Sequence, residues 1–246
     1  LTVWDTLMAQ GFSPNRIVLV GESAGGNLCL SLCQKLRAQH RTLPAALALL
    51  SPWADLQQTG ASYEQLKDID ATLSAPGLMK SALDYAGGSP EKLADPMISP
   101  VLADFTDFPD TQIHVGTAEL LLSDSELLAE AMRRDRVSVQ LIRWEGMCHV
   151  FQMFGFPESR ESLKAIGAFL RYKLHISPET EEKFRSQLLK NKNSSGFSMF
   201  KAKSTENQCW HEEVISKVDL KKYEASRFWW MDFPGVGHLR TSLWDD

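Results

Sequence analysis

A serine lies between two glycines near the start of the chain, in the segment Gly21-Glu22-Ser23-Ala24-Gly25. This G-x-S-x-G pattern is typical of a sharp strand-to-helix turn that lifts a serine hydroxyl above the end of a strand, where it can act as a nucleophile. We expect both glycines to be steric requirements, since a Cβ at either position would press against the neighbouring strand or helix. An apolar run precedes the pattern and an amphipathic stretch follows it, which is the context that such a turn needs.

A nucleophilic serine needs a general base, and four histidines stand where one could lie. The base must reach the hydroxyl, and a carboxylate must hold the tautomer of the base. In folds with this turn the chain order is serine, acid, histidine, which leaves His149, His175, His211 and His238 of the six histidines. We select His149 because it follows a predicted strand, at the end of an α/β sheet where active-site residues collect.

Two carboxylates compete for the role of the acid. Glu119 follows a predicted strand and stands beside the loop of His149. Asp124 lies within Ser123-Asp124-Ser125-Glu126, which we interpret as a capping box in which Ser123 caps a helix and Glu126 reaches back. A carboxylate in that place stabilises helix amides and has a structural reason to exist. We therefore favour Glu119 and keep Asp124 as the alternative.

The elements that position these residues follow from the alternation of short apolar runs with amphipathic ones, which indicates strands joined by helices into a mostly parallel sheet. The first strand is apolar on both faces, as expected of a buried parallel strand. The helix after Ser23 is expected to bury Leu28, Leu32 and Leu36. Residues 53–108 are rich in turn formers and predict an excursion over the sheet edge, a candidate lining of the active site. The sequence predicts strands over residues 17–20, 45–50, 112–115 and 138–144, and helices up to residue 11, after residue 23, and over residues 77–85, 123–134 and 158–173.

Composition excludes several classes of partner. The chain has 246 residues and a formal net charge of −5, which gives no attraction to nucleic acid. No apolar run approaches the roughly 20 residues that cross a bilayer. Cys29, Cys33, Cys148 and Cys209 lack the spacing of a disulfide framework or a zinc site, so they predict free thiols and a cytoplasmic protein. The chain begins at Leu1 within a predicted helix, so the lack of a signal segment is weak evidence on localisation.

Several segments together resemble the hormone-sensitive-lipase-like esterases of the α/β-hydrolase fold. The resemblance runs in unbroken order from Leu1 to Lys173, and it implies that fold: a mostly parallel sheet with flanking helices in residues 1–175. The family usually has Asp as its acid, and Glu119 aligns with it; a branch of these esterases is similar in carrying Glu there. The segments are Gly21-Glu22-Ser23-Ala24-Gly25-Gly26, Ser51-Pro52-Trp53-Ala54-Asp55-Leu56, Asp95-Pro96-Met97-Ile98-Ser99-Pro100, residues 116–125 and residues 144–151.

One part of the family pattern is missing from the sequence. The family binds the oxyanion with backbone amides of a His-Gly-Gly-Gly loop upstream of the serine, together with the amide after it, here Ala24. The sequence has no such loop, and the family's first strands and cap helices are absent as well. We therefore expect an amino-terminally incomplete member whose first strand is an unprotected edge. The isolated chain is expected to be poorly soluble and to have little activity.

The resemblance implies carboxylic-ester hydrolysis through an acyl-enzyme. Ser23 would attack, His149 would transfer the proton, Glu119 would orient His149, and Ala24 N–H would bind the oxyanion. The implied partner is an ester of small to medium acyl chain, with no metal or organic cofactor and no nucleic acid; membrane contact is not favoured. The alternatives are an inactive truncated product and a small-molecule-binding protein on the same scaffold. This fold serves as a small-molecule receptor when its histidine is lost.

The segment after Ile176 carries no function in its sequence. Residues 176–246 are polar and predict a linker at Lys190–Gly196 followed by an extension. Trp229 and Trp230 beside Arg227 could anchor at a membrane interface or on a partner, because Trp is amphipathic. We favour the simpler interpretation of a poorly ordered or partly packed appendage.

Overall fold

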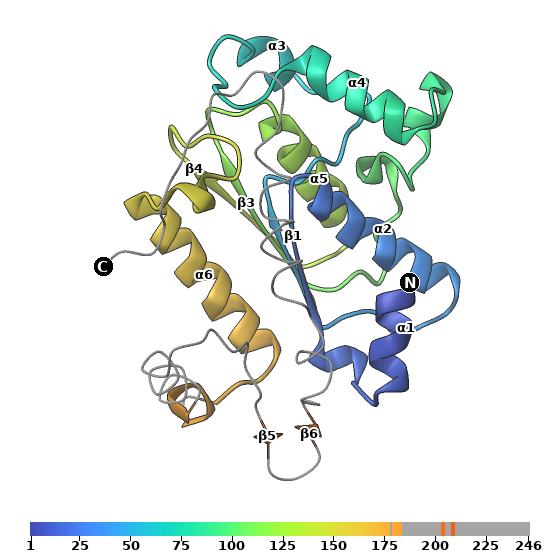
Figure 1. Ribbon diagram of the computed structural model, residues 1–246, viewed down its shortest axis with the longest axis vertical. Coiled ribbons are helices and arrows are strands. Elements are labelled where there is room, and N and C mark those ends of the chain that lie inside the picture. The colour runs from blue at the N-terminus through green and yellow to red at the C-terminus, as the bar shows by residue number, and fades with distance from the viewer. Residues whose placement is uncertain (178, 184–202, 205–207, 210–246) are drawn as a thin grey trace, which may run out of the picture. The chain divides into compact units, whose positions relative to one another are not determined.

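A four-stranded parallel sheet forms the centre of the larger unit of the protein. The computed structural model describes residues 1–177, 179–183, 203–204 and 208–209. The strands lie side by side in chain order, β1 (Val18–Glu22), β2 (Ala46–Leu50), β3 (Thr111–Gly116) and β4 (Val139–Trp144) (Figure 1). All three strand pairs are parallel. The four predicted strands are confirmed, with ends shifted by one or two residues.

The chain divides into two compact units. One spans Ser13–His175 and contains the sheet. The other consists of Leu1–Phe12 and Ile176–Asp246, and it contains α1 (Thr2–Ala9) and a short antiparallel pair, β5 (Lys203–Ser204) and β6 (Gln208–Cys209). The predicted linker at residues 190–196 and the tryptophan-containing stretch near residue 229 lie outside the described residues. No helix in the described part of the chain is long and apolar enough to cross a bilayer.

Helices cover both faces of the sheet, as expected for parallel strands. Figure 1 shows the sheet nearly edge-on, with α6 (Pro157–Lys173) on one side and α2 (Ala24–Ala38) and α5 (Leu122–Arg134) on the other. Successive side chains of a strand point to opposite faces. In β2, Leu47 and Leu49 accordingly join the cluster that contains residues of α2 and α5, whereas Ala48 and Leu50 pack with α6. The predicted helices over these three segments are confirmed.

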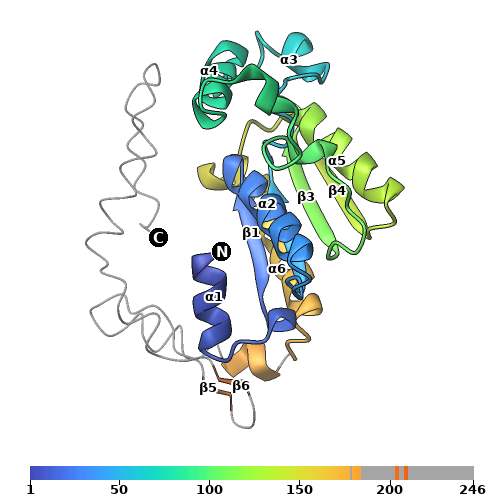
Figure 2. The ribbon, with the colours of Figure 1, turned by 90° about the vertical axis from the view of Figure 1, so that its right-hand side faces the viewer.

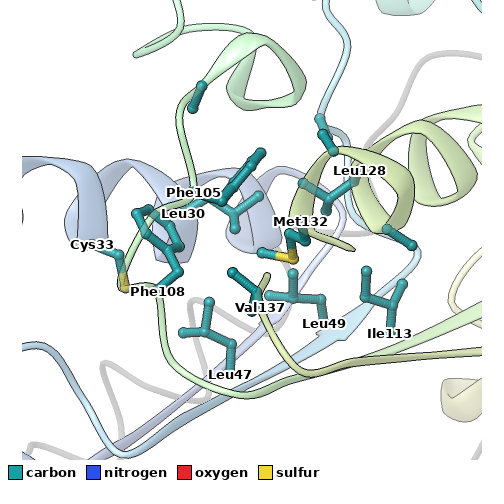
Figure 3. Close-up of a cluster of buried hydrophobic side chains, with 14 residues drawn as sticks. Leu30, Cys33, Leu47, Leu49, Phe105, Phe108, Ile113, Leu128, Met132 and Val137 are labelled. Carbon is teal, nitrogen blue, oxygen red and sulfur yellow. The ribbon is translucent and has the colours of Figure 1, made fainter. Parts of the chain in front are cut away.

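The main apolar core lies between the sheet, α2 and α5 (Figure 3). Leu30 from α2, Leu49 and Ile113 from the sheet, and Leu128 and Met132 from α5 are fully buried in it. Burial of a Leu, Ile or Met side chain contributes about 1.5–3 kcal/mol. This cluster therefore fixes the two helices that follow β1 and β3, and with them the turns that carry Ser23 and Glu119.

The predicted buried face of α2 is wrong at its start. Leu28 is 58% exposed, and Asn27 is buried instead. The Asn27 amide donates to the carbonyl oxygens of Trp53, at 3.0 Å, and Ile98, at 2.9 Å. These two bonds compensate for its burial and turn the helix, so that Leu30 and Cys33 face the core.

The first strand is also more exposed than its apolar sequence predicts. In the described part of the chain β1 pairs with β2 alone, and Val20 is 53% exposed. Burial on both faces is therefore not found. Among the described residues the strand lies at an edge of the sheet, and it carries one charged residue, Glu22, at its end.

The connection between β2 and β3 builds a second apolar cluster. It contains α3 (Ser62–Gln65), α4 (Ala75–Tyr85) and two 3₁₀ helices, Pro90–Ala94 and Pro100–Leu102. This segment, which the sequence predicted as an excursion over the sheet edge, connects the two inner strands of the described sheet. In Figures 1 and 2, α3 and α4 lie beyond one end of the sheet. Their cluster includes Leu120 and Leu121, which follow Glu119.

The predicted capping box at the start of α5 is absent. The helix begins at Leu122, and its first residues have no side-chain cap. The Ser123 hydroxyl accepts from Ser62 N at 2.9 Å, and the Ser62 hydroxyl accepts from Ser123 N at 3.1 Å. Glu126 forms an ion pair with Arg143 at 2.7 Å. The side chains of Ser123 and Glu126 thus bond to residues of other segments instead of to the start of α5.

Candidate active site

Ser23 lies on a strained turn between β1 and α2. Its backbone has φ 51° and ψ −123°, a region that residues with a Cβ seldom adopt. Ser23 N donates to Leu50 O at 2.9 Å, and Trp53 N donates to Ser23 O at 3.0 Å. These bonds to the segment after β2 hold the turn in place. The hydroxyl itself makes no hydrogen bond to a described residue, so it is available for chemistry.

The two glycines of the serine pattern have different roles. A Cβ on Gly21 would lie 2.4 Å from Gly25 O, closer than real atoms approach. A Cβ on Gly25 would meet nothing within 4 Å, so the expected steric requirement there is wrong. The second tight position is Gly26, whose Cβ would lie 2.9 Å from Pro52 Cβ. The pattern needs glycine where α2 and the chain after β2 approach the turn.

Alanine at Gly21 and alanine at Gly25 are expected to change the free energy of unfolding differently. Gly21→Ala should lower the free energy of unfolding by about 1–3 kcal/mol, because the backbone of the turn must shift. Gly25→Ala should leave it unchanged or raise it by up to about 1 kcal/mol, since alanine favours a helix more than glycine does. Urea denaturation of both variants tests this, and equal losses of stability would contradict it.

Glu119 and His149 form a pair at the carboxyl ends of β3 and β4. Glu119 Oε1 lies 3.4 Å from His149 Nδ1. The carboxylate is fully buried, and the histidine side chain is 11% exposed. Glu119 Oε2 accepts from the Ser51 hydroxyl at 2.8 Å and from Gly116 N at 3.2 Å. These donors compensate for burial of the charge and leave Oε1 directed at the imidazole.

The loop that carries His149 is joined to the loop that carries Glu119. Ala118 N donates to Met147 O at 3.0 Å, and Gly146 N donates to the Thr117 hydroxyl at 2.8 Å. A Cβ on Gly116 would lie 2.0 Å from Met147 O, so only glycine permits this approach. The backbone thus fixes the spacing of acid and base before any side-chain contact is considered.

Each of the four neighbouring strands is followed by one residue of this site, at the carboxyl end of the strand. Ser23 follows β1, Ser51 follows β2, Glu119 follows β3 and His149 follows β4. The carboxyl ends of parallel strands are where open α/β sheets place their active sites. Among the described residues no hydrogen bond joins Ser23 to His149. Catalytic hydrogen bonds are often long before substrate binds, so this is compatible with a nucleophile and its base.

Comparison with known proteins identifies the fold family. A family model described as alpha/beta hydrolase fold matches residues 1–153. The chain belongs to this family.

Similar proteins are named as a hydrolase and an esterase. The chain is 36% identical to an acetyl-hydrolase of Streptomyces hygroscopicus over 70% of this chain and 57% of that protein. It is 35% identical to an esterase of Acinetobacter venetianus over 68% of this chain and 55% of that protein. The chain thus spans little more than half the length of these relatives.

Solved structures give the same result. An esterase of the bacterial hormone-sensitive lipase family superposes with a TM-score of 0.67 at 36% identity, covering 70% of this chain and 58% of that one. A hormone-sensitive lipase from a metagenome library superposes with a TM-score of 0.66 at 37% identity and the same coverage.

Asp124, the alternative acid, has its contacts elsewhere in the protein. It is fully buried, and its Oδ2 accepts from Ala54 N at 3.0 Å and Asp55 N at 2.8 Å. Its Oδ1 has no hydrogen-bond partner among the described residues. Burial raises the pKa of Asp124 well above its usual value. Asp124 anchors the chain after β2, and the structure does not hydrogen-bond it to His149.

The other histidines lie away from this edge of the sheet or outside the described residues. His175 follows α6 and lines a hollow of about 900 Å³ beside Ala45 and Asp110, at the amino-terminal ends of β2 and β3. His211 and His238 fall outside the described residues. No cluster of three or more potential metal ligands occurs in the described part of the chain. Of the two candidate bases that the structure describes, His149 and His175, it brings His149 to a carboxylate at the carboxyl ends of the strands.

His114 is a buried structural histidine that the sequence did not single out. Trp144 Nε1 donates to His114 Nδ1 at 3.0 Å. Nδ1 therefore carries no proton, so Nε2 carries it and donates to Gln112 Oε1 at 3.0 Å. The Ser162 hydroxyl also lies 2.8 Å from Nδ1. His114 thereby links β3, β4 and α6 in its neutral form.

Neutral His114 is expected to make the stability of the protein sensitive to acid. Burial lowers the pKa of His114 to about 4, below its ordinary value of 6.5. Between these values the unfolded chain binds the proton that the folded chain excludes, so stability falls as pH falls from about 6.5 to about 4. Between pH 7 and pH 5 the parent should lose about 2 kcal/mol more than His114→Asn, whose amide oxygen can still accept from Trp144. Urea denaturation at both pH values measures this, and equal losses in the two proteins would contradict it.

Proposed function

We propose that the protein hydrolyses carboxylic esters, with Ser23 as nucleophile, His149 as general base and Glu119 as the acid that orients it. The observation that carries the proposal is the placement of these residues after β1, β4 and β3 at one edge of the sheet, with Glu119 Oε1 3.4 Å from His149 Nδ1. The names of the similar esterases support the same reaction class.

The proposed reaction has two halves. Ser23 Oγ bonds to the ester carbonyl carbon while His149 Nε2 takes the hydroxyl proton, and His149 then gives that proton to the departing alcohol. Water next attacks the acyl-enzyme, His149 takes one of its protons, and Ser23 leaves with that proton as the free acid forms. Glu119 stays ionised throughout and stabilises the imidazolium that forms in each half.

Ala24 is the proposed oxyanion donor. It is the first residue of α2, where a backbone N–H has no partner within the helix. No described residue accepts from it, and the helix dipole favours negative charge at this position. An amide fixed beside the nucleophile stabilises the oxyanion of the tetrahedral intermediate, and each such donor contributes about 10²–10³ in rate.

The proposed substrates are esters of small to medium acyl chain. The name acetyl-hydrolase for the Streptomyces hygroscopicus relative supports a short acyl group. The alternative, a small-molecule receptor on the same scaffold, has less support, because the serine, the histidine and the carboxylate are all present and the last two are in contact.

A fluorophosphonate probe tests the proposal directly. The protein, expressed from its complete reading frame, should take up one equivalent of probe on Ser23, because only an activated serine attacks phosphorus at neutral pH. Heat-denatured protein is the control for non-specific labelling, and peptide mapping identifies the modified serine. No labelling of the folded protein would support the receptor and contradict the hydrolase.

A further inference from the structure

Ser51 is a buried residue with a strained backbone, directly after β2. It is fully buried and has φ 46°, in the left-handed region that serine seldom adopts. Strain of this kind persists only where the surrounding structure enforces it, and such positions gather at functional sites. What enforces it here is a set of bonds from Ser51 to β3 and to the loops that follow β3 and β4.

The backbone around Ser51 is fixed by the neighbours of β2. Ser51 N donates to His114 O on β3 at 2.7 Å. On the other side, Leu50 O accepts from Ser23 N, and Trp53 N donates to Ser23 O. The residues before and after Ser51 thus hold the turn of the nucleophile.

The Ser51 hydroxyl reaches the other two members of the triad. It donates to Glu119 Oε2 at 2.8 Å and accepts from Val150 N at 3.2 Å. Val150 directly follows His149, so its N–H belongs to the peptide bond that joins the two residues. Val150 also has a left-handed backbone, with φ 47°. One hydroxyl therefore holds the carboxylate and the backbone of the base at the same time.

We propose that Ser51 is a positioning residue of the active site, whose hydroxyl aligns Glu119 with His149 while residues before and after it, Leu50 and Trp53, hold the turn of Ser23. The inference rests on the proposed hydrolase function. Ser51 does not act on substrate itself. Without its hydroxyl, the carboxylate keeps Gly116 N as its remaining donor, and Val150 N loses a buried acceptor. Both members of the 3.4 Å pair can then move apart.

Ser51→Ala tests the role, and Ser99→Ala is its matched control. Ser99 is also fully buried, and its hydroxyl donates to Leu93 O and accepts from Leu56 N, the same bonding pattern away from the triad. Displacement of a catalytic group by about 1 Å lowers rates by roughly 10²-fold. We expect Ser51→Ala to lower kcat for a short-chain nitrophenyl ester by about 10²-fold with KM nearly unchanged. Ser99→Ala should keep kcat within about threefold of the parent.

Two further measurements separate positioning from a loss of folding. The rate constant of fluorophosphonate labelling should fall with kcat in Ser51→Ala and stay in Ser99→Ala. The far-downfield proton resonance of His149 Nδ1–H should shift or broaden in Ser51→Ala alone. If Ser51→Ala does not fold, Ser51→Gly removes the same hydroxyl and relieves the left-handed strain, and it should give the same loss of kcat.

The outcomes distinguish the two proposals. A Ser51 variant that labels at the parental rate and keeps kcat within about threefold overturns the positioning role and leaves the hydrolase intact. Equal losses in Ser51→Ala and Ser99→Ala overturn it as well, because the effect is then general to buried serines. A parent that takes up no probe contradicts the hydrolase, and the role of Ser51 with it.

Discussion

Ser23→Ala is expected to lower kcat/KM for a short-chain nitrophenyl ester by about 10⁵-fold or more, in protein expressed from its complete reading frame. Without the hydroxyl no acyl-enzyme can form, and water must attack the bound ester directly. The remaining rate comes from substrate binding and the oxyanion donor alone. The strained backbone of residue 23 is held by bonds of its own N and O atoms, so the variant should keep the fold.

His149→Ala should cause nearly the same loss, and the double variant should be no worse than Ser23→Ala alone. Members of a triad act as a unit, so their losses do not add. Ser81→Ala is the control, because Ser81 is exposed on α4 and outside the site. Steady-state kinetics of the four proteins decide the matter. Residual rates within tenfold of the parent would overturn the triad.

Local sequence was sufficient to predict the four strands of the sheet and the longer helices, and to propose Ser23, Glu119 and His149 as a triad. Short apolar runs such as Ala46–Leu50 predict strands because a buried parallel strand is apolar on both faces. The turn at Ser23 was predictable because its glycine pattern stands between a strand and a helix. His149 and Glu119 were then selected by chain order and by their places after strands, and the structure brings these two side chains together. The strands and the turn need only residues that are near one another in the sequence, and the acid and base need in addition the order of the residues along the chain.

Side-chain partners far apart in the sequence could not be predicted in this way. Ser123 was expected to cap its own helix, but it pairs with Ser62, 61 residues away. Ser51 stands 68 residues from Glu119 and 99 from Val150, and nothing in its immediate sequence indicates either bond. Asn27 replaces Leu28 on the buried face of α2 for the same reason, since its acceptors lie on other segments. Propensity and periodicity report local preference, which such tertiary contacts override.

Glu119→Gln and Asp124→Asn are expected to have contrasting effects, and the contrast identifies the acid. Glu119 Oε2 receives two donors, the Ser51 hydroxyl and Gly116 N. The one oxygen of a glutamine must therefore stay with them, and its NH₂ group then faces His149 Nδ1. Two donors cannot share a hydrogen bond, so His149 must take the tautomer with its proton on Nε2. That tautomer cannot accept the proton of Ser23, and kcat/KM should fall by about 10⁴-fold.

Asp124→Asn should leave kcat/KM within about threefold of the parent. Burial raises the pKa of Asp124, which favours its neutral form, and an asparagine has the shape of that form. Its amide oxygen can accept from Ala54 N and Asp55 N as the carboxyl oxygen does. Because these bonds are retained, the free energy of unfolding should fall by no more than about 1 kcal/mol, the value of one hydrogen bond. Kinetics and urea denaturation of both variants test the pair. If Asp124→Asn lowers kcat/KM by orders of magnitude and Glu119→Gln does not, the acid is Asp124 and the assignment of Glu119 is wrong.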